Sequence, residues 1–488
     1  MSKKLPKQKT NFSEWYTQLV KIAGLADYGP VKGTMVIKPY GFQLWDNIKD
    51  SFDKMIKKTG HVNAYFPLFI PKSFLAKEAE HVEGFAKECA VVTHTRLKND
   101  EDKGVVVDPD SKLDEEIIVR PTSETVIWSM YKKWIQSYRD LPILINQWAN
   151  VVRWEMRTRL FLRTSEFLWQ EGHTAHETKE EAQKEALDIL ELYRQLAEDH
   201  LAVPVYTGVK TESEKFAGAE KTYCIEAMMG DKRALQAGTS HDLGQNFAKA
   251  FDVTFQTKDN KEEFVWATSW GVSTRLVGAV ILTHGDDKGL RLPPKIAPIQ
   301  VVIIPITKNE DEKSDVKSYL DSTLESLKNK GVRIYVDWTD NTPGYKFNEW
   351  EMKGVPIRME VGPRDIKNQK VVLARRDIGE KIFLSKNDIL DTVPVLLKKI
   401  QDNLFQEAKN FRDTNTYYVS TYEEFCSTIE SGGFVRCGWD GSSDTESKIK
   451  ENTKATIRCI PFNEEPDGKY CILSGKPARH EVIFAKAY

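Results

Sequence analysis

Four arginines in a short segment near residue 160 are the side chains best suited to hold a phosphate group. They are Arg153, Arg157, Arg159 and Arg163, and Glu155, Glu166 and Glu171 are interleaved with them. The segment predicts a strand, a loop and a second strand, and guanidinium groups can bind phosphate oxygens in bidentate fashion. Alternating charges are equally typical of a solvated, salt-bridged surface, so this segment alone leaves both interpretations open.

Two further clusters downstream could complete a binding site. The first contains Gln236, Thr239 and His241, and the second, TSWGVSTR, ends at Arg275. Small residues would let the backbone approach a ligand closely, and a cation at the start of the following helix suits an anionic substrate. Taken singly, each cluster is commonplace, because such a histidine is more often structural and such a segment more often an ordinary helix start.

Upstream, residues 121–125 (PTSET) have the composition of a helix N-terminus. Thr122 and Glu124 do not have the spacing of a capping box, which places the acidic residue three positions after the Ser or Thr. The spacing therefore leaves Glu124 free to bind an ammonium group, although the segment could also be only a helix N-cap.

Motifs of several common enzyme classes are absent. Neither GxxxxGK[ST] nor a GxGxxG that follows a strand occurs, so a nucleotide would have to be held by side chains rather than by a glycine-rich loop. His173, His176 and Glu177 lie close together but spell neither HExxH nor HxxEH, and a helical zinc protease site is not predicted.

The chain of 488 residues is too long for one hydrophobic core, and its pattern predicts three units. Residues 1–296 predict an α+β unit with a long-stranded antiparallel sheet. Residues 297–400 alternate strands and helices as in an α/β domain, and residues 401–488 predict a small α+β unit with four of the six cysteines. Prolines 293, 294 and 298 mark the first boundary.

Three local elements are predicted with particular clarity. An apolar stripe over 182–197 indicates an amphipathic helix. Residues 61–71 predict a strand, and residues 96–119 a hairpin.

The composition excludes a strongly acidic or strongly basic protein. The 70 basic and 72 acidic residues give a net charge of -2, so any contact with nucleic acid must be local. A hydrophobic content of 40% predicts globular units. The basic N-terminus lacks the apolar run of a signal peptide, and no stretch of 18 apolar residues follows, so we expect a cytoplasmic protein with reduced cysteines.

The combination and order of these motifs resemble the prolyl-tRNA synthetase family, class II enzymes, in its archaeal and eukaryotic type. The segments that carry the resemblance are PTSE, RWE, FLRTSEFLWQEGH, GTSHDLGQNF, TSWGVSTR, GDDKGLRLPP, PGYKFNEWEMKGVPIRMEVGPRD and the terminal FAKAY. The resemblance runs nearly end to end and includes YGPVKGTMVIKPYGFQLWD with Pro67 as a dimer-forming motif. It implies a class II catalytic domain over 1–296, an anticodon-binding domain over 297–400 and a zinc-binding-like domain over 401–488.

The resemblance also implies a reaction and its site. The enzyme would activate L-proline with ATP and Mg²⁺ and load it onto tRNA(Pro), as a homodimer. The implied catalytic residues are Arg153 and Arg275. The implied proline-binding residues are Thr122, Glu124, Arg153, Trp169, Glu171, His173, His241, Ser269, Trp270 and Gly271. The implied ATP-binding residues are Arg153, Glu155, Arg163, Thr164, Phe167, Gln236, Thr239 and Arg275. Glu351, Arg358 and Arg364 stand where the family reads the anticodon.

One departure from the family concerns zinc. The family's C-terminal unit usually carries C-x4-C and C-x2-C, but here Cys437 is followed by Ser442 and Cys471 by Ser474. Two thiolates do not close a tetrahedral site, and serine is a poor zinc ligand. We predict no structural zinc, with Cys459 or His480 as the only candidate substitutes.

Three other functions compete with this interpretation. A synthetase for threonine, serine or glycine is disfavoured by Thr122 and Glu124 together with WQEGH. A catalytically silent tRNA-binding relative is disfavoured because both Arg153 and Arg275 are present. A generic ATP-dependent transferase would leave the unit over 297–400 unexplained.

Overall fold

An eleven-stranded sheet forms the backbone of the computed structural model, which describes residues 5–75, 89–155, 157–462, 466 and 468–488. In spatial order its strands are β22 (Thr416–Tyr418), β23 (Phe434–Trp439), β25 (His480–Ala485), β24 (Thr456–Pro461), β11 (Val205–Val209), β12 (Lys221–Met228), β13 (Ala234–Gly244), β16 (Trp266–Ser273), β10 (Glu166–His176), β9 (Ile143–Val152) and β3 (Val62–Asn63). Neighbours from β9 to β11 are all antiparallel, which confirms the predicted sheet.

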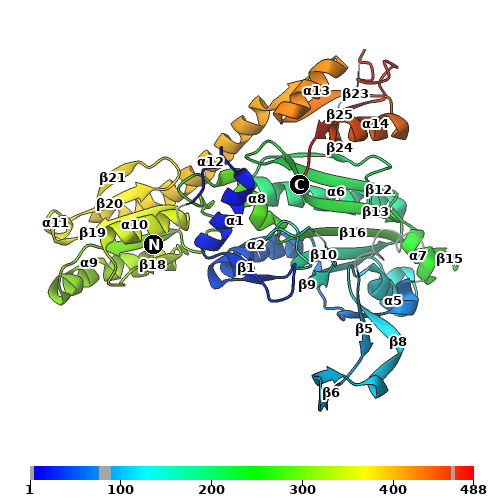
Figure 1. The fold of residues 1–488 in the computed structure, drawn as a ribbon, viewed down its shortest axis with the longest axis horizontal. Helices are drawn as coiled ribbons and strands as arrows, with labels where there is room; N and C mark the ends of the chain where they lie inside the picture. Colours follow the sequence, from blue (N-terminus) through cyan, green and yellow to red (C-terminus); the bar gives the residue numbers. More distant parts are fainter. Residues whose placement is uncertain (1–4, 76–88, 156, 463–465, 467) are drawn as a thin grey trace.

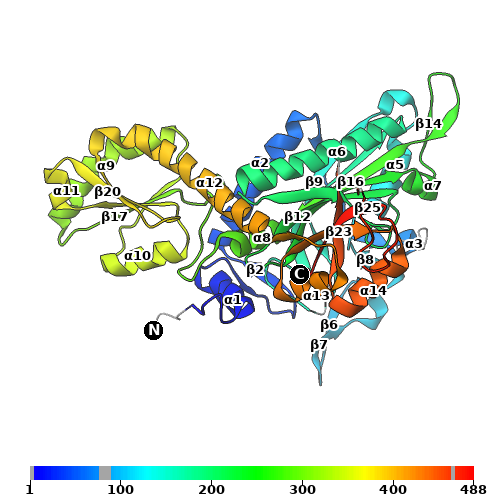
Figure 2. The same cartoon turned by 90° about the horizontal axis from the view of Figure 1, so that it is seen from above.

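Helix α6 (Lys179–Gln195) covers one face of this sheet and packs across β10, β12, β13 and β16 (Figure 2). It begins with a capping box between Thr178 and Glu181, and its predicted apolar stripe is buried. The same core receives α1 (Phe12–Ile22), α2 (Pro39–Lys58) and α8 (Arg275–His284). Tyr193 of α6 packs on Phe52 of α2, with ring centroids 5.1 Å apart. The helix therefore fixes one face of the sheet, and the site described below lies on the other.

Smaller elements surround the sheet. They comprise α3 (Lys72–Leu75), α5 (Glu124–Trp134), α7 (Asn246–Phe251) and the strands β1 (Ala26–Tyr28), β2 (Met35–Ile37), β4 (Phe69–Pro71), β5 (Ala90–His94), β6 (Leu97–Asp100), β7 (Gly104–Val107), β8 (Lys112–Val119), β14 (Thr254–Gln256) and β15 (Glu262–Phe264). The hairpin predicted within 96–119 is confirmed as β6 and β7, and it projects from the body of the molecule (Figure 1).

The strand predicted over 61–71 is two short strands, β3 and β4, separated by residues 64–68. Pro67 lies in the gap and has no N–H to donate to a ladder. Side chains bind the backbone there instead: the Phe66 N–H donates to Gln147 Oε1 at 2.8 Å, and Arg120 Nη1 donates to the Phe66 carbonyl at 2.6 Å. The sequence pattern indicated an extended chain correctly but not its hydrogen-bond partners.

The predicted α/β unit is confirmed as a separate five-stranded sheet. Its order is β18 (Ile334–Val336), β17 (Val301–Pro305), β19 (Ile357–Val361), β20 (Lys370–Arg375) and β21 (Lys381–Ser385), with β17 parallel to both neighbours. Its helices are α9 (Glu310–Asn329), α10 (Pro343–Met352) and α11 (Pro363–Lys367). Asn309 caps α9 by accepting a hydrogen bond from the Glu312 N–H at 2.8 Å.

Helix α12 (Ile389–Thr414) runs without interruption through residue 400, where the sequence predicted a boundary. Figure 1 shows it connecting the five-stranded sheet to the C-terminal unit, which holds α13 (Tyr422–Ser431) and α14 (Ser443–Thr453). Antiparallel pairing of β11 with β24, through Val209 and Ile460, joins the C-terminal unit to the large sheet. The C-terminal unit therefore extends the large sheet.

No described helix has the length and apolar character needed to cross a membrane.

A buried histidine makes stability depend on pH. His284 at the end of α8 donates from Nε2 to the Leu201 carbonyl at 3.0 Å, and burial lowers its pKa from 6.5 to about 4. Between these values the unfolded chain binds a proton that the folded chain does not, so stability falls as the pH falls from about 6.5.

We predict that the wild-type chain loses about 2 kcal/mol more unfolding free energy than His284→Gln between pH 7 and pH 5. Glutamine keeps a donor for the Leu201 carbonyl but does not titrate. Urea unfolding at the two pH values measures the difference. Equal losses in the two proteins would contradict the assignment of a neutral, buried imidazole.

Candidate active site

A cavity of about 300 Å³ lies on the face of the large sheet opposite α6. It brings together most of the residues that the sequence implied for proline and ATP. Those that line it are Thr122, Glu124, Arg153, Phe167, Trp169, His173, Gln236, Thr239, His241, Ser269, Trp270, Gly271 and Arg275. Its volume is at the lower end of the range for small-molecule sites.

The floor of the cavity is set by the register of three strands. Gly271 of β16 is opposite both Glu171 of β10 and Thr239 of β13, and Ser269 is likewise opposite His173 and His241. Cross-strand partners point to the same face of a sheet, so these positions gather on one side. The alternate residues face α6: Tyr193 Oη donates to Gln170 Oε1 at 2.9 Å, and Ser240 Oγ to the Ala186 carbonyl at 2.7 Å.

The backbone and the ring of Trp270 lie on different faces of the sheet. It borders the cavity, but its ring packs over Gly172 on the side of α6, with its centroid 5.2 Å from that of His61 and 6.5 Å from that of Tyr193. The ring therefore packs on the face of the sheet that α6 covers, opposite the cavity. Only the backbone at Trp270 is placed to meet a ligand on the cavity face.

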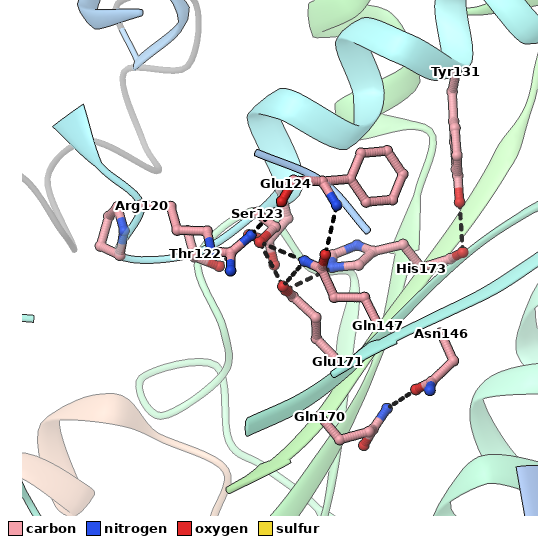
Figure 3. A network of polar contacts seen from close by, with 12 residues as sticks. Arg120, Thr122, Ser123, Glu124, Tyr131, Asn146, Gln147, Gln170, Glu171 and His173 are labelled. Atoms are coloured by element: carbon pink, nitrogen blue, oxygen red, sulfur yellow. Dashed lines mark hydrogen bonds and ion pairs between the residues drawn. The ribbon is translucent and has the colours of Figure 1, made fainter. Parts of the chain in front are cut away.

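A buried hydrogen-bond network holds the acidic end of the cavity (Figure 3). Glu171 accepts hydrogen bonds from the Ser123 hydroxyl and from Gln147 Nε2 at 2.6 Å, and its other oxygen lies 3.1 Å from His173 Nε2. Thr122 donates to the Glu124 carboxylate. Glu171 itself does not line the cavity, so it holds the residues that do.

Ser123 and Gln147 are members of this network that the sequence did not single out. Ser123 occupies the N-cap position of α5 but makes no side-chain cap bond, because its hydroxyl is directed to Glu171. Its place inside PTSET was a usable signal. Gln147 carries none, since its role arises from pairing opposite Glu171 on β9.

Two arginines also line the cavity. Arg153 donates from Nε to the Pro121 carbonyl at 3.0 Å, and its guanidinium lies 5.6 Å from the ring centroids of both Phe167 and Trp169. Arg275 is largely buried and donates to the Leu162 and Gln236 carbonyls at 3.2 and 3.4 Å.

Arg275 forms no ion pair with any carboxylate of the described residues. Burial, with the repulsion of Arg153 and Arg163, lowers its pKa to about 10, and it stays protonated at pH 7. A desolvated cation of this kind favours an anionic ligand.

The remaining residues implied for ATP lie beside the cavity rather than on its wall. Glu155 and Arg163 form an ion pair, with Arg163 Nε 3.0 Å from Glu155 Oε2. Thr164 is buried and donates to the Glu166 carbonyl at 2.7 Å. In this structure the salt-bridge interpretation therefore applies to Glu155 and Arg163, whereas Arg153 faces the cavity.

His241 is neutral and connects to residues that the sequence analysis missed. Burial lowers its pKa to about 4. Its Nδ1 lies 3.0 Å from Thr222 Oγ1, and its ring stacks on Phe216 at 4.5 Å. Thr222, Phe216 and Glu214 also line the cavity. No local motif marks them, because they reach the site through cross-strand pairing and a loop.

Two of the three residues implied for the anticodon share a second cavity, in the α/β unit. Glu351 of α10 and Arg358 of β19 line a space of about 130 Å³ together with Lys288, Arg375, Arg376 and Lys381. Arg358 lies 4.1 Å from the Phe347 ring centroid and donates to Glu360 Oε1 at 2.9 Å. Arg364 on α11 is exposed and does not line this cavity.

The cysteines of the C-terminal unit do not form a zinc ligand set. Cys437 and Cys471 are buried in one core, and burial with the neighbouring Cys471 raises the pKa of the Cys437 thiol above its usual range. Asp440 accepts hydrogen bonds from Ser474 Oγ at 2.7 Å and from the Ser442 N–H at 3.1 Å. Across the part of the chain that the structure describes, no three His, Cys, Asp or Glu side chains gather as metal ligands. That zinc is not bound stays a prediction.

Comparison with known proteins agrees with this arrangement. Residues 106–284 match the tRNA synthetase class II core domain (G, H, P, S and T), residues 300–396 an anticodon binding domain, and residues 422–488 the C-terminal domain of prolyl-tRNA synthetase. Proteins named proline–tRNA ligase are 57% identical in Cytophaga hutchinsonii, 59% in Porphyromonas gingivalis and 58% in Bacteroides fragilis. Each alignment covers 100% of this chain and at least 99% of the relative.

The core match and the antiparallel sheet define a class II aminoacyl-tRNA synthetase. Because the C-terminal match and the full-length relatives are prolyl enzymes, the chain belongs to the prolyl-tRNA synthetase family. The expected archaeal or eukaryotic type is not borne out, since these relatives are bacterial.

Gly172 and Gly271 lie on neighbouring strands, and of the two only Gly172 is packed tightly against a side chain. A Cβ at Gly172 would lie 2.1 Å from the Trp270 ring, whereas a Cβ at Gly271 would meet only the Gln170 carbonyl, at 3.2 Å.

We predict that Gly172→Ala lowers the free energy of unfolding by about 1–3 kcal/mol through overpacking, and that Gly271→Ala lowers it much less. Urea unfolding of both variants tests this, and a Gly172→Ala protein as stable as wild type would show that the ring is not confined there.

Proposed function

We propose that the chain activates L-proline with ATP, releasing pyrophosphate, and transfers the prolyl group to the 3′ end of tRNA(Pro). The observation that carries the proposal is the largely buried Arg275 guanidinium, which is hydrogen-bonded to carbonyls at one end of the cavity while Glu124 lies at the wall. A zwitterionic amino acid and a phosphate match that distribution of charge.

The acidic part of the cavity would hold the amino acid. Glu124, braced by Thr122, would bind the cationic imino group of proline. Trp169, His173, His241, Ser269 and Gly271 would enclose the ring, with Glu171 fixing His173 from below. A neutral His241 adds no positive charge near that imino group.

The arginine end would hold the nucleotide. Arg153 and Arg275 would bind the proline carboxylate and the α-phosphate of ATP, with Phe167, Gln236 and Thr239 on the adjacent wall. Glu155, Arg163 and Thr164 would act at its margin, after the Glu155–Arg163 pair opens toward the nucleotide. Magnesium would enter with ATP as part of the substrate.

The first chemical step then needs no general base. The proline carboxylate is ionised at pH 7 and attacks the α-phosphorus, and pyrophosphate leaves with the bonding electrons. Negative charge spreads over the phosphate oxygens in the transition state. Preorganised guanidinium groups lower the barrier by stabilising that charge.

The unit over residues 297–400 would bind the tRNA. We propose that residues 1–296 form the catalytic domain, residues 297–400 the anticodon-binding domain and residues 401–488 the C-terminal domain. Glu351, Arg358 and Arg364 would read anticodon bases. Unpaired bases are recognised through their edges, and the basic cavity around Arg358 supplies donors for them.

A homodimer would cover exposed apolar side chains around the edge strand β3. Val62, Tyr65 and Phe69 are 61%, 72% and 50% exposed. Apolar side chains clustered at a sheet edge indicate an association surface.

We predict that Arg153→Ala slows proline-dependent ATP–pyrophosphate exchange at least about a hundredfold, of order 3 kcal/mol, because one charge donor to the transition state is lost. Arg157→Ala is the matched control, since Arg157 belongs to the same loop but is exposed and lies off the cavity. Rates for Arg153→Ala close to those of the control would refute the role. Running the wild-type chain with a panel of amino acids, followed by charging of tRNA(Pro), tests the substrate.

We predict that Val62→Asp shifts the chain from dimer to monomer in sedimentation velocity, because it buries a carboxylate at the proposed interface. Phe383→Asp is the control, since Phe383 is 72% exposed on β21, which belongs to the five-stranded sheet and not to the sheet that contains β3. A wild-type monomer, or an unaltered Val62→Asp dimer, would exclude this interface.

A further inference from the structure

Residues 211–216 form a wall of the cavity that is held from outside the catalytic unit. Glu214 and Phe216 line the cavity, and neither was implied for proline or ATP by the sequence. The segment follows β11 and precedes β12, and its outer side faces α14 of the C-terminal unit.

Glu446 of α14 makes the central contact with this segment. Its carboxylate accepts a hydrogen bond from Thr211 Oγ1 at 2.9 Å and another from Ser213 Oγ at 2.7 Å. Glu446 is only 4% exposed and Thr211 only 3%. Hydrogen bonds to a buried carboxylate are strong, so they fix the two hydroxyl groups in place.

A second contact on the same helix reaches a cavity residue directly. Lys450 Nζ lies 3.1 Å from Glu214 Oε1. Lys450 and Glu446 are four positions apart and lie on the same side of α14. One helix of the C-terminal unit therefore binds residues 211, 213 and 214.

The inner side of the segment is joined to the proposed proline pocket. The Phe216 N–H donates to Thr222 Oγ1 at 2.9 Å, and Thr222 Oγ1 lies 3.0 Å from His241 Nδ1. The Phe216 ring stacks on the His241 ring with an interplanar angle of 30°. The segment therefore contacts Glu446 on its outer side and His241, through Phe216, on its inner side.

The base on which α14 rests is itself fixed to the catalytic unit. Lys210 Nζ donates to the Arg458 carbonyl at 2.6 Å, and both Lys210 and Arg458 pair with the buried Glu226, at 2.7 and 3.0 Å. Together with the pairing of β11 and β24, these contacts fix the position of α14 relative to residues 211–216. Glu446 therefore lies on a helix whose position is fixed by contacts between the C-terminal unit and the catalytic unit.

We propose that Glu446 is a positioning residue for the reaction: it holds residues 211–213 so that Glu214 and Phe216 close the amino-acid end of the cavity. This rests on the proposed function, because it takes the pocket at His241 to be the proline pocket. The C-terminal unit thereby shapes amino-acid binding without contacting the substrate.

The test is pyrophosphate exchange with separate titrations of proline and ATP. Glu446→Ala raises KM for proline by about tenfold or more, which corresponds to about 1.4 kcal/mol, and changes KM for ATP much less. Glu446→Gln keeps the shape of the side chain, and its amide can accept from one hydroxyl and donate to the other, so it restores most of the proline affinity. Glu451→Ala, an exposed glutamate on the same helix, behaves as wild type.

Thr211→Val removes the hydroxyl partner without touching α14 and reproduces the selective rise in KM for proline. The double variant Glu446→Ala/Thr211→Val is no worse than Glu446→Ala, because both changes break one interaction. Thr211→Val also provides a test if Glu446→Ala unfolds.

Equal changes in both KM values, or additive effects in the double variant, would overturn the proposal. Proline-independent exchange by the wild-type chain and by Glu451→Ala would instead overturn the proposed function on which it rests.

Discussion

The register between β10, β13 and β16 is the constraint on which the site depends. It sets Glu171, Gly271 and Thr239 in one row and His173, Ser269 and His241 in the next. A slip of one residue would exchange these side chains with Gln170, Ser240 and Trp270, which face α6. The buried core between α6 and the sheet opposes that slip, because it would expose the Trp270 ring and bury charge.

Given this register, the charged side chains give the cavity an acidic part and a basic part. Glu124 lies at one end and accepts a hydrogen bond from Thr122, while Glu171 holds the neighbouring His173. Arg275 lies at the other, bound to carbonyls alone among the described residues. Because the guanidinium is already partly shielded from water, it loses less hydration than an exposed arginine when a phosphate enters. The same separation orients a zwitterionic amino acid.

Much of this could be predicted from local sequence. The helical stripe over 182–197, the antiparallel sheet and the α/β unit followed from periodicity, whereas Arg153 and Arg275 were chosen from the family resemblance. The face of the Trp270 ring could not be predicted, since it depends on which strands are neighbours. Glu214 could not be predicted because its partner Lys450 lies more than 200 residues away along the chain. Phe216 could not be predicted because its contacts with Thr222 and His241 depend on strand pairing. The continuous helix through residue 400 shows that a domain boundary need not interrupt secondary structure.

The most direct test is a crystal structure with a non-hydrolysable analogue of prolyl-adenylate. The account predicts that the phosphate replacement lies within about 3 Å of guanidinium nitrogens of both Arg153 and Arg275. It also predicts that the prolyl ring lies between Trp169 and His241. An analogue bound away from both guanidinium groups would contradict the account.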